Sequence, residues 1–253
     1  MKLLKGQFGV FSLLLFVSCS GSFQITEMSS QLVELKSPTA NQIASETTLL
    51  LKPYRDSVSK TMDLVVGQSE QPMERGKPES ILGNFVTDVC KSMVDSVLIS
   101  KGEKPTDLFV FNLGGLRGAF PKGAIKLGDV YQVMPFDNEL VWVDIPHDSL
   151  VSLLHYIQVR GGIPISGATM SLSANAENCM VFKNGKSLSP GEFYRIGTND
   201  FLARGGDGMN MFNVVQELPS TGIKVRDAIL YHILKMTEQN KTIKVELDGR
   251  IIQ

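Results

Sequence analysis

A continuous apolar run, Leu-Phe-Val-Phe at residues 108–111, has the length of a strand and ends at Asn112 and two glycines. Such a run predicts a strand buried in a sheet. Residues 79–99 differ, because their apolar side chains recur at helical spacing and form one stripe. Helix and strand patterns intermix along the chain, so we expect an α/β (α+β) fold, with a mixed β-sheet and packed helices. The other expected helices lie at 53–62, 148–158 and 225–238, and the other expected strands at 64–66, 140–145, 193–197 and 243–247.

The composition is that of an ordinary globular protein. The 253 residues include 43% hydrophobic and 20% charged side chains, and the formal net charge is -1. This is enough apolar material for one good core. The charge balance gives no reason to expect a non-specific grip on a nucleic-acid polymer or on an anionic membrane. An anionic ligand would have to be bound locally, by a few placed Arg or Lys side chains.

The N-terminus has the pattern of a targeting signal. Two lysines precede an apolar run at 8–18, which is too short for a stable membrane-spanning helix. The run ends at Cys19, which small residues surround as in a bacterial lipobox, although Phe16 stands where Leu is usual. We expect residues 1–18 to be a lipoprotein signal peptide and Cys19 to be lipidated, with a plain secretory signal as the alternative. Lipidation would anchor the protein in the cell envelope, on the periplasmic or cell-surface side of a bacterial membrane.

A change in composition near residue 48 divides the rest of the chain. Residues 19–47 are rich in Ser, Thr, Gln and Asn and lack apolar periodicity, so we expect a flexible tether. Residues 48–253 have a globular composition and predict one domain. This domain contains Cys90 and Cys179, which can pair in an oxidising compartment. Buried thiols are the alternative that the apolar neighbours of Cys90 favour.

The segment TNDFLARGGDG at 198–208 is the clearest candidate for ligand binding. Phe201 stands six residues ahead of Asp207, which lies between two glycines. An aromatic ring can stack on a nucleobase, and a carboxylate on a glycine-rich loop can accept hydrogen bonds from ribose hydroxyls. The plainer interpretation is an aspartate in a turn, which is a common role for this residue.

Three further segments have candidate binding residues at the ends of expected strands or helices. Asn112 opens NLGGLR, where the glycines permit close approach of the backbone and Arg117 suits a phosphate. A tight strand exit with a solvated arginine is the alternative. Phe136, in PFDN, is either a stacking platform or a core residue. Arg75 precedes a helix start and, taken by itself, is a surface charge.

Together these motifs make the chain similar to the C-terminal domain of the 5′-nucleotidase family, which includes periplasmic UDP-sugar hydrolases. The resemblance runs from about residue 48 to the closing DGRI at 248–251, and the order and spacing of the motifs match as well. The other matching motifs are ESILGN at 79–84, NLGGLR at 112–117, PFDN at 135–138, SG at 166–167 and NDFLARGGDG at 199–208.

In that family the domain binds the nucleoside part of the substrate, so the resemblance implies a nucleotide or nucleoside ligand. Phe136 and Phe201 would hold the base between them. Asp207 would bind the ribose hydroxyls, and Asn112 would lie beside base and sugar. Two-sided stacking tolerates different bases and is worth roughly 1–3 kcal/mol per base.

The resemblance also places Arg117 at the phosphate, with help from Arg75. Two residues depart from the family's pattern. Leu113 stands where a glycine is usual, and we expect it to narrow the approach of the backbone to a ligand. Asp137 also replaces a glycine and adds negative charge near the proposed phosphate side, which would favour an uncharged nucleoside or a well-neutralised phosphate.

The chemistry of the family belongs to a separate N-terminal metallophosphatase domain with two metal ions. The histidines at 147, 155 and 232 lack the spacing of such a metal cage, so we expect no catalytic residue, metal or cofactor in this chain and divalent metals only in a partner phosphatase. The resemblance implies a substrate-binding domain that acts in extracytoplasmic nucleotide catabolism with a separately encoded metallophosphatase. The alternatives are a non-catalytic envelope lipoprotein that binds nucleosides or nucleotides, and a degenerate domain kept for assembly.

Overall fold

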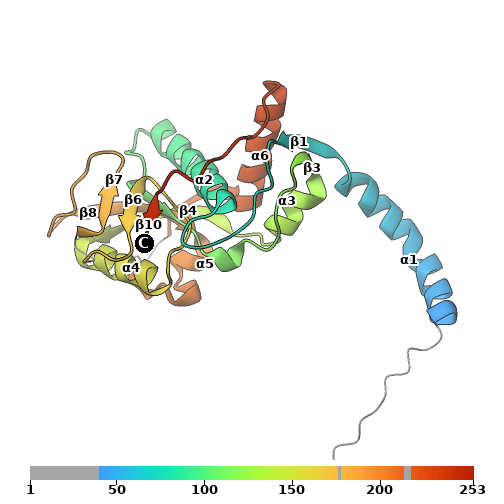
Figure 1. Ribbon diagram of the computed structural model, residues 1–253, viewed down its shortest axis with the longest axis horizontal. Helices are drawn as coiled ribbons and strands as arrows, with labels where there is room; N and C mark the ends of the chain where they lie inside the picture. Colours follow the sequence, from blue (N-terminus) through green and yellow to red (C-terminus); the bar gives the residue numbers. More distant parts are fainter. Residues whose placement is uncertain (1–39, 176–177, 214–217) are drawn as a thin grey trace, which may run out of the picture. The chain divides into compact units, whose positions relative to one another are not determined.

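The computed structural model describes residues 40–175, 178–213 and 218–253 (Figure 1). The expected signal peptide, Cys19 and most of the expected tether lie outside these residues. Helix α1 spans Ala40–Met62, so it begins before the helix expected at 53–62 and includes the last residues of the expected tether. The compact unit described below spans Leu50–Gln253. Among the described residues, no helix has both the length and the apolar character that crossing a bilayer requires.

A five-stranded mixed sheet forms the centre of this unit. The strand order is β5-β2-β8-β4-β9, in which β2 and β8 are parallel and the other neighbours are antiparallel. The expected mixed-sheet α/β fold is therefore confirmed. The strands are β2 Leu108–Val110, β4 Glu139–Pro146, β5 Ile165–Ser166, β8 Phe193–Asn199 and β9 Ser220–Lys224.

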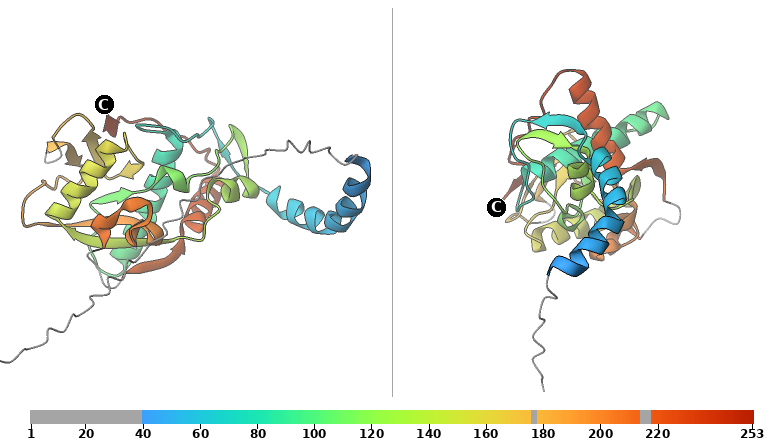
Figure 2. Two further views of the ribbon diagram at one scale, coloured as in Figure 1. Left: turned by 90° about the horizontal axis from the view of Figure 1, so that it is seen from below. Right: turned by 90° about the vertical axis from the view of Figure 1, so that its right-hand side faces the viewer.

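Alternate side chains of the central strands enter two separate hydrophobic cores. Phe109 and Trp142 belong to the core that includes α2 and α6, whereas Leu108 and Val141 belong to the core that includes α4. Helices therefore cover both faces of the sheet (Figures 1 and 2), and a strand buried on both faces reads as a continuous apolar run. The helices are α2 Ile81–Ser100, α3 Leu127–Val133, α4 His147–Val159, α5 Asp200–Ala203 and α6 Val225–Glu238.

Two smaller sheets complete the unit, and they correct one expectation. The strand expected at 243–247 is wrong, because within this segment only Ile243 forms a bridge, to Ser69. Its alternating apolar residues, Ile243 and Val245, instead pack against the first core. The last strand is β10, which pairs with β6 in parallel. The strands of these sheets are β1 Val65–Ser69 with β3 Gly123–Lys126, and β10 Ile251–Ile252 with β6 Ala168–Ser171 and β7 Met180–Phe182.

The sheet separates the two cysteines of the domain. Cys90 belongs to the first core and Cys179 to the second, and the two are not joined in a disulfide. Burial raises the pKa of both thiols. The buried-thiol alternative is the one that the structure supports.

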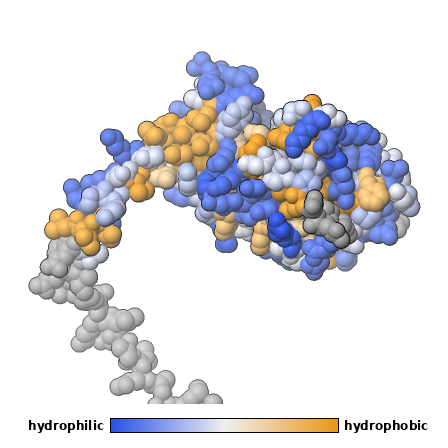
Figure 3. Space-filling model, turned by 180° about the vertical axis from the view of Figure 1, so that it is seen from behind, coloured by the Kyte–Doolittle hydropathy of each residue, from blue (hydrophilic) through white to orange (hydrophobic). Residues whose placement is uncertain are grey.

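Apolar side chains remain exposed where α1 leads into β1 (Figure 3). Val58, Leu64 and Val65 are each more than half exposed to solvent. Isolated apolar residues on a surface are ordinary, whereas several that gather on one face indicate a contact surface.

The ESILGN motif at the start of α2 has a structural role. Ser80 caps the helix by accepting a hydrogen bond from the Gly83 backbone N–H at 3.1 Å. A Cβ on Gly83 would lie 2.8 Å from Ser80 Oγ, so this cap requires glycine. Asn84 donates to Glu79 Oε1 at 2.6 Å and to the Glu246 carbonyl at 3.0 Å. The motif therefore ties the C-terminal segment to α2.

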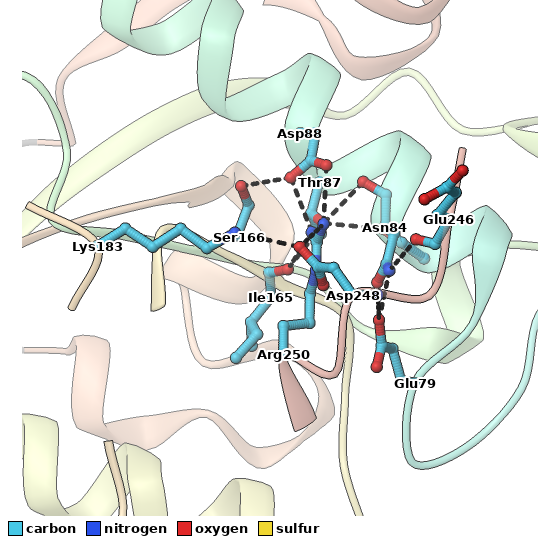
Figure 4. A network of polar contacts seen from close by, with 11 residues as sticks. Glu79, Asn84, Thr87, Asp88, Ile165, Ser166, Lys183, Glu246, Asp248 and Arg250 are labelled. Carbon is cyan, nitrogen blue, oxygen red and sulfur yellow. Dashed lines mark hydrogen bonds and ion pairs between the residues drawn. The ribbon is translucent and has the colours of Figure 1, made fainter. Parts of the chain in front are cut away.

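Arg250, from the closing DGRI motif, is a buried arginine at the centre of a polar network (Figure 4). Its side chain is 5% exposed. It donates to Asp88 and to Asp248, each at 2.7 and 3.0 Å, and to the Ile165 carbonyl at 3.0 Å. Ser166, from the SG motif, donates to Asp88 Oδ1 at 2.6 Å. The SG and DGRI motifs thus join the C-terminal end of the chain to α2 and β5.

Acid should weaken this network through Asp248. Burial alone would raise the pKa of Asp248, but hydrogen bonds and charges from Arg250 and Lys183 outweigh burial and lower this pKa to about 2. Because an unfolded aspartate has a pKa of about 4, the carboxylate stabilises the fold above about pH 4, and this contribution is lost as the pH falls towards about 2. We expect the urea midpoint of Asp248→Asn to lie below that of the wild type at about pH 6, and the difference to shrink towards about pH 2.

The matched control for this titration is Asp56→Asn, because the Asp56 side chain is 63% exposed and a surface ion pair contributes little. Its midpoint should follow the wild type at every pH. A difference between Asp248→Asn and the wild type that is the same across the whole range would contradict the assignment.

Candidate functional site

The ends of three strands bring distant loops together around one pocket. NLGGLR follows β2 and NDFLARGGDG begins at the end of β8, and these parallel neighbours end at the same edge of the sheet. PFDN precedes β4, whose Leu140 pairs with Asn199 of β8, so this loop reaches the same edge. The pocket has a volume of about 330 Å³. It is lined by Phe111, Asn112, Gly114, Gly115, Arg117, Met134, Phe136, Asn138, Asn199, Phe201 and Asp207.

Two aromatic rings line this pocket and remain accessible. Phe136 is 38% exposed and Phe201 is 46% exposed, so neither is a core residue. The guanidinium carbon of Arg117 lies 5.4 Å from the centroid of the Phe136 ring, within the range of a cation–π contact. The pocket therefore offers two flat apolar surfaces, and the permanent positive charge of the Arg117 guanidinium lies next to the Phe136 ring.

Short-range contacts fix Phe201. Asn199 caps α5 by accepting a hydrogen bond from the Leu202 backbone N–H at 2.8 Å. Asp200 Oδ1 accepts from the Phe201 backbone N–H at 2.9 Å and from Asn138 Nδ2 at 3.0 Å, which links the loop after β8 to PFDN. A Cβ on Gly206 would lie 2.5 Å from Phe201 Cε1, so only glycine lets the ring lie where it does.

Asp207 is in a turn and also lines the pocket. Its backbone is left-handed, with φ 54°, which costs about 1–2 kcal/mol in a residue with a Cβ. Its carboxylate Oδ2 accepts from Asn112 Nδ2 at 2.6 Å, and its carbonyl accepts from Tyr156 Oη at 2.9 Å and Arg160 Nη2 at 3.1 Å. In the described part of the chain nothing donates to the second carboxylate oxygen, Oδ1, which stays available to a ligand.

Asn112 connects the loop after β2 to Asp207. Its side chain is largely buried, and its Oδ1 has no hydrogen-bond partner among the described residues. A Cβ on Gly115 would lie 2.7 Å from this oxygen and 2.8 Å from the Phe111 ring. The second glycine of NLGGLR is therefore needed for Asn112 to lie over the loop and reach Asp207.

Arg75 and Leu113 lie outside the pocket lining. Arg75 donates to the Leu116 carbonyl at 3.1 Å, so it supports the loop that carries Arg117 and does not itself reach the pocket. Leu113 does not narrow the pocket, because its side chain is not part of the wall.

The structure also differs from the expectation that Asp137 adds negative charge near the phosphate side of the pocket. It forms ion pairs with Arg226 and Lys224 and is not a lining residue. The hydrogen bond from Arg226, with the hydrogen bond and charge of Lys224, lowers the pKa of Asp137. A carboxylate neutralised by two cations outside the wall does not oppose a phosphate, so the expected preference for an uncharged ligand loses its basis.

Four lining residues were not expected as site residues: Phe111, Met134, Asn138 and Asn199. Asn138 and Asn199 lie inside motifs that the sequence already singles out. Their polar side chains at strand ends are the signal that could have identified them as site residues. Phe111 and Met134 read as core residues and are indeed buried, so no sequence signal marks their contribution to the pocket.

The histidines occupy separate environments. His147 forms a contact of 3.2 Å with Asp148, and His232 packs edge-on against Phe85 with ring centroids 5.7 Å apart. Burial lowers the pKa of His232. Within the ranges that the structure describes, no group of three or more His, Cys, Asp or Glu side chains is placed to hold a metal ion.

Replacing Asn112 by aspartate tests its contact with Asp207, because the change should lower the stability of the fold in a pH-dependent way. Two carboxylates in hydrogen-bond contact repel, so the pKa of one is raised. A raised pKa stabilises the fold at low pH, and this stabilisation is lost as the pH rises. We expect Asn112→Asp to be less stable than the wild type by about 1 kcal/mol at about pH 7, since Asp207 is exposed and partly screened, and the difference to shrink at about pH 4.

Urea unfolding at the two pH values measures this difference. Asn112→Ala is the control, because it removes the hydrogen bond without adding a charge, so its difference from the wild type should change much less between the two pH values. A difference for Asn112→Asp that changes equally little would show that the two side chains do not meet as described.

Comparison with known proteins places this chain in a family. Residues 65–214, more than half of the chain, match the family model described as 5′-nucleotidase, C-terminal domain. Protein UshA of Yersinia enterocolitica is 26% identical over 200 residues, which are 77% of this chain and 36% of that protein. A probable 5′-nucleotidase of Treponema pallidum is 26% identical over 193 residues, which are 68% of this chain and 31% of that protein.

The solved structures agree with this result. The crystal structure of a 5′-nucleotidase precursor from Thermus thermophilus superposes with a TM-score of 0.64 and 26% identity, over 83% of this chain and 43% of that one. This chain therefore spans less than half of the length of these three relatives. The chain belongs to the family of 5′-nucleotidase C-terminal domains.

Proposed function

We propose that this domain binds the nucleoside part of a nucleotide or nucleoside, as the substrate-binding component of a 5′-nucleotidase-type hydrolase system. One observation carries this proposal. A single pocket combines two exposed rings, one arginine and one carboxylate with a free oxygen, from Phe136, Phe201, Arg117 and Asp207. These groups suit the three parts of a nucleotide, which are a flat base, an anionic phosphate and a sugar with hydroxyl donors.

The dimensions and charges of the pocket fit a ligand of this size. A volume of about 330 Å³ lies at the lower end of the range for small-molecule sites, which suits one nucleoside better than a dinucleotide. Arg117 lies against the Phe136 ring, so its guanidinium is close to whatever stacks on that ring. Stacking would provide roughly 1–3 kcal/mol per base without selecting strongly among bases.

Hydrolysis in this proposal comes from a separately encoded metallophosphatase, and the pair works in the cell envelope. The lipobox pattern at Cys19 in the N-terminal sequence supports the envelope location. The exposed apolar side chains Val58, Leu64 and Val65 offer this phosphatase a contact surface.

Loss of one ring should weaken ligand binding. Calorimetry with adenosine and with AMP should show binding of both by the wild-type chain. Phe201→Ala should bind each roughly five- to 150-fold more weakly, since one stacked base is worth roughly 1–3 kcal/mol. Phe193→Ala is the matched control, because Phe193 is 61% exposed but lies outside the pocket lining. A wild-type chain that binds neither ligand would refute the proposed function.

The proposed separation of substrate binding and hydrolysis into two chains predicts a second result. The purified chain should release no phosphate from AMP, and release should begin when the metallophosphatase and its divalent metal are added. In that mixture Phe201→Ala should lower the rate at low AMP concentration, whereas Phe193→Ala should not. Phosphate release by the purified chain alone would exclude a separate catalytic partner.

A further inference from the structure

Two residues at the C-terminal end of α4 form hydrogen bonds with the backbone carbonyl of Asp207 and lie outside the pocket lining. Tyr156 Oη donates to the Asp207 carbonyl at 2.9 Å, and Arg160 Nη2 donates to the same oxygen at 3.1 Å. We propose that Tyr156 and Arg160 are positioning residues that give the pocket its preference for a sugar with free 2′- and 3′-hydroxyls. This inference rests on the proposed function, in which the Asp207 carboxylate binds the ribose.

Tyr156 and Arg160 act through Asp207, because neither belongs to the pocket lining. The guanidinium carbon of Arg160 lies 4.8 Å from the centroid of the Tyr156 ring, so the two side chains also support each other. Burial raises the pKa of Tyr156, which keeps its hydroxyl protonated and able to donate at neutral pH. Both groups are therefore donors aimed at one carbonyl oxygen.

The helix that carries this pair is a rigid support. One side of α4 is fully buried in the second core, through Leu150, Leu153, Leu154 and Ile157. The Arg160 backbone is held as well, because its carbonyl accepts a hydrogen bond from Lys77 Nζ. The position of the Asp207 carbonyl is consequently fixed relative to the sheet and not only relative to its own loop.

The loop that carries Asp207 needs this support, because its glycine-rich sequence does not by itself restrict the backbone to one conformation. Asp207 has the left-handed φ of 54°, and its neighbours Gly205 and Gly208 have φ values of 85° and 83°. Glycine adopts many other conformations at little cost, so a strained residue between glycines persists only where its surroundings over-determine it. Tyr156 and Arg160 fix the carbonyl, and Asn112 fixes one carboxylate oxygen at 2.6 Å.

These contacts leave Oδ1 as the oxygen that meets the ligand, at a position set by three side chains. A recognition group must lie within about 0.5 Å of its productive position to act fully. Without the two donors from α4 the loop can turn the carboxylate away, while the rings that stack on the base stay in place. The part of the affinity that depends on the sugar hydroxyls should fall, and the part that depends on the base should not.

The test compares adenosine with 2′,3′-dideoxyadenosine by calorimetry. The wild-type chain should prefer adenosine. In the double variant Tyr156→Phe, Arg160→Met this preference should fall roughly fivefold, as expected for the loss of one to two hydrogen bonds, with the affinity for dideoxyadenosine unchanged. Asp207→Ala should abolish the preference, and adding the two α4 changes to it should have no further effect, since all three act on one contact.

Two matched variants separate positioning from general damage. Arg160→Lys keeps a donor and should retain more of the preference than Arg160→Met. Tyr231→Phe removes a tyrosine hydroxyl from the exposed face of α6 and should leave both affinities unchanged. Urea midpoints of all variants show whether the fold is intact.

Three results would overturn the inference alone while the wild type still prefers adenosine. These are an unchanged preference in the double variant, an equal loss of affinity for both nucleosides, or a loss in Arg160→Met that appears with AMP and not with adenosine, which would place Arg160 at the phosphate. A wild-type chain that binds no adenosine would instead overturn the proposed function, and this inference with it.

Discussion

The pairing of β8 with both β2 and β4 is the interaction on which the rest of the structure depends. It aligns the ends of β2 and β8 and brings the start of β4 to the same edge, so three loops meet there. The register also requires Gly197 opposite Phe109, because a Cβ at Gly197 would lie 2.6 Å from the Phe109 ring. A slip of one residue would turn every side chain of the strand to the other face. The core and the pocket are thus set by the same pairing.

The motifs shared with the family have two different roles. NLGGLR, PFDN and NDFLARGGDG contribute residues to the pocket, whereas ESILGN, SG and DGRI contribute Asn84, Ser166 and Arg250 to contacts that hold the C-terminal segment. Glycine serves two purposes in these motifs: at Gly83 and Gly206 it permits a close approach of neighbouring atoms, and at Gly208 and Gly249 it adopts a positive φ of 83° and 71°. A motif rich in glycine and polar residues therefore indicates a constrained backbone before it indicates a ligand.

Local signals in the sequence are sufficient for the long elements, whereas the candidate pocket residues were identified through the resemblance to the family. The helices at 81–100, 147–159 and 225–238 and the strands β2, β4 and β8 follow from apolar periodicity, because burial selects that pattern directly. The strand expected at 243–247 was wrong because the same alternation serves core packing without a partner strand. Six other strands, β3, β5, β6, β7, β9 and β10, had no clear pattern of their own.

Long-range contacts were beyond the reach of sequence patterns. Arg226, which neutralises Asp137, lies on α6, far along the chain from the PFDN loop, and nothing in the sequence near PFDN indicates this contact. The same holds for Tyr156 and Arg160, whose contacts with Asp207 depend on how α4 packs. These residues look like ordinary positions on a helix, so their contribution to the site appears only in three dimensions.

The charges in the pocket lining suggest how binding and chemistry are divided in the proposed system. The lining contains one cation, Arg117, and one anion, Asp207. A phosphate monoester carries about two negative charges at neutral pH, so Arg117 can balance only part of them. Asp137 does not worsen this balance, because Lys224 and Arg226 already neutralise it. In the proposed system, the metal ions of a metallophosphatase would balance the remaining charge at the bond to be cleaved. On these grounds the pocket should hold the nucleoside by itself and the phosphate only in part, which leaves the reacting group oriented towards a partner that supplies the metals.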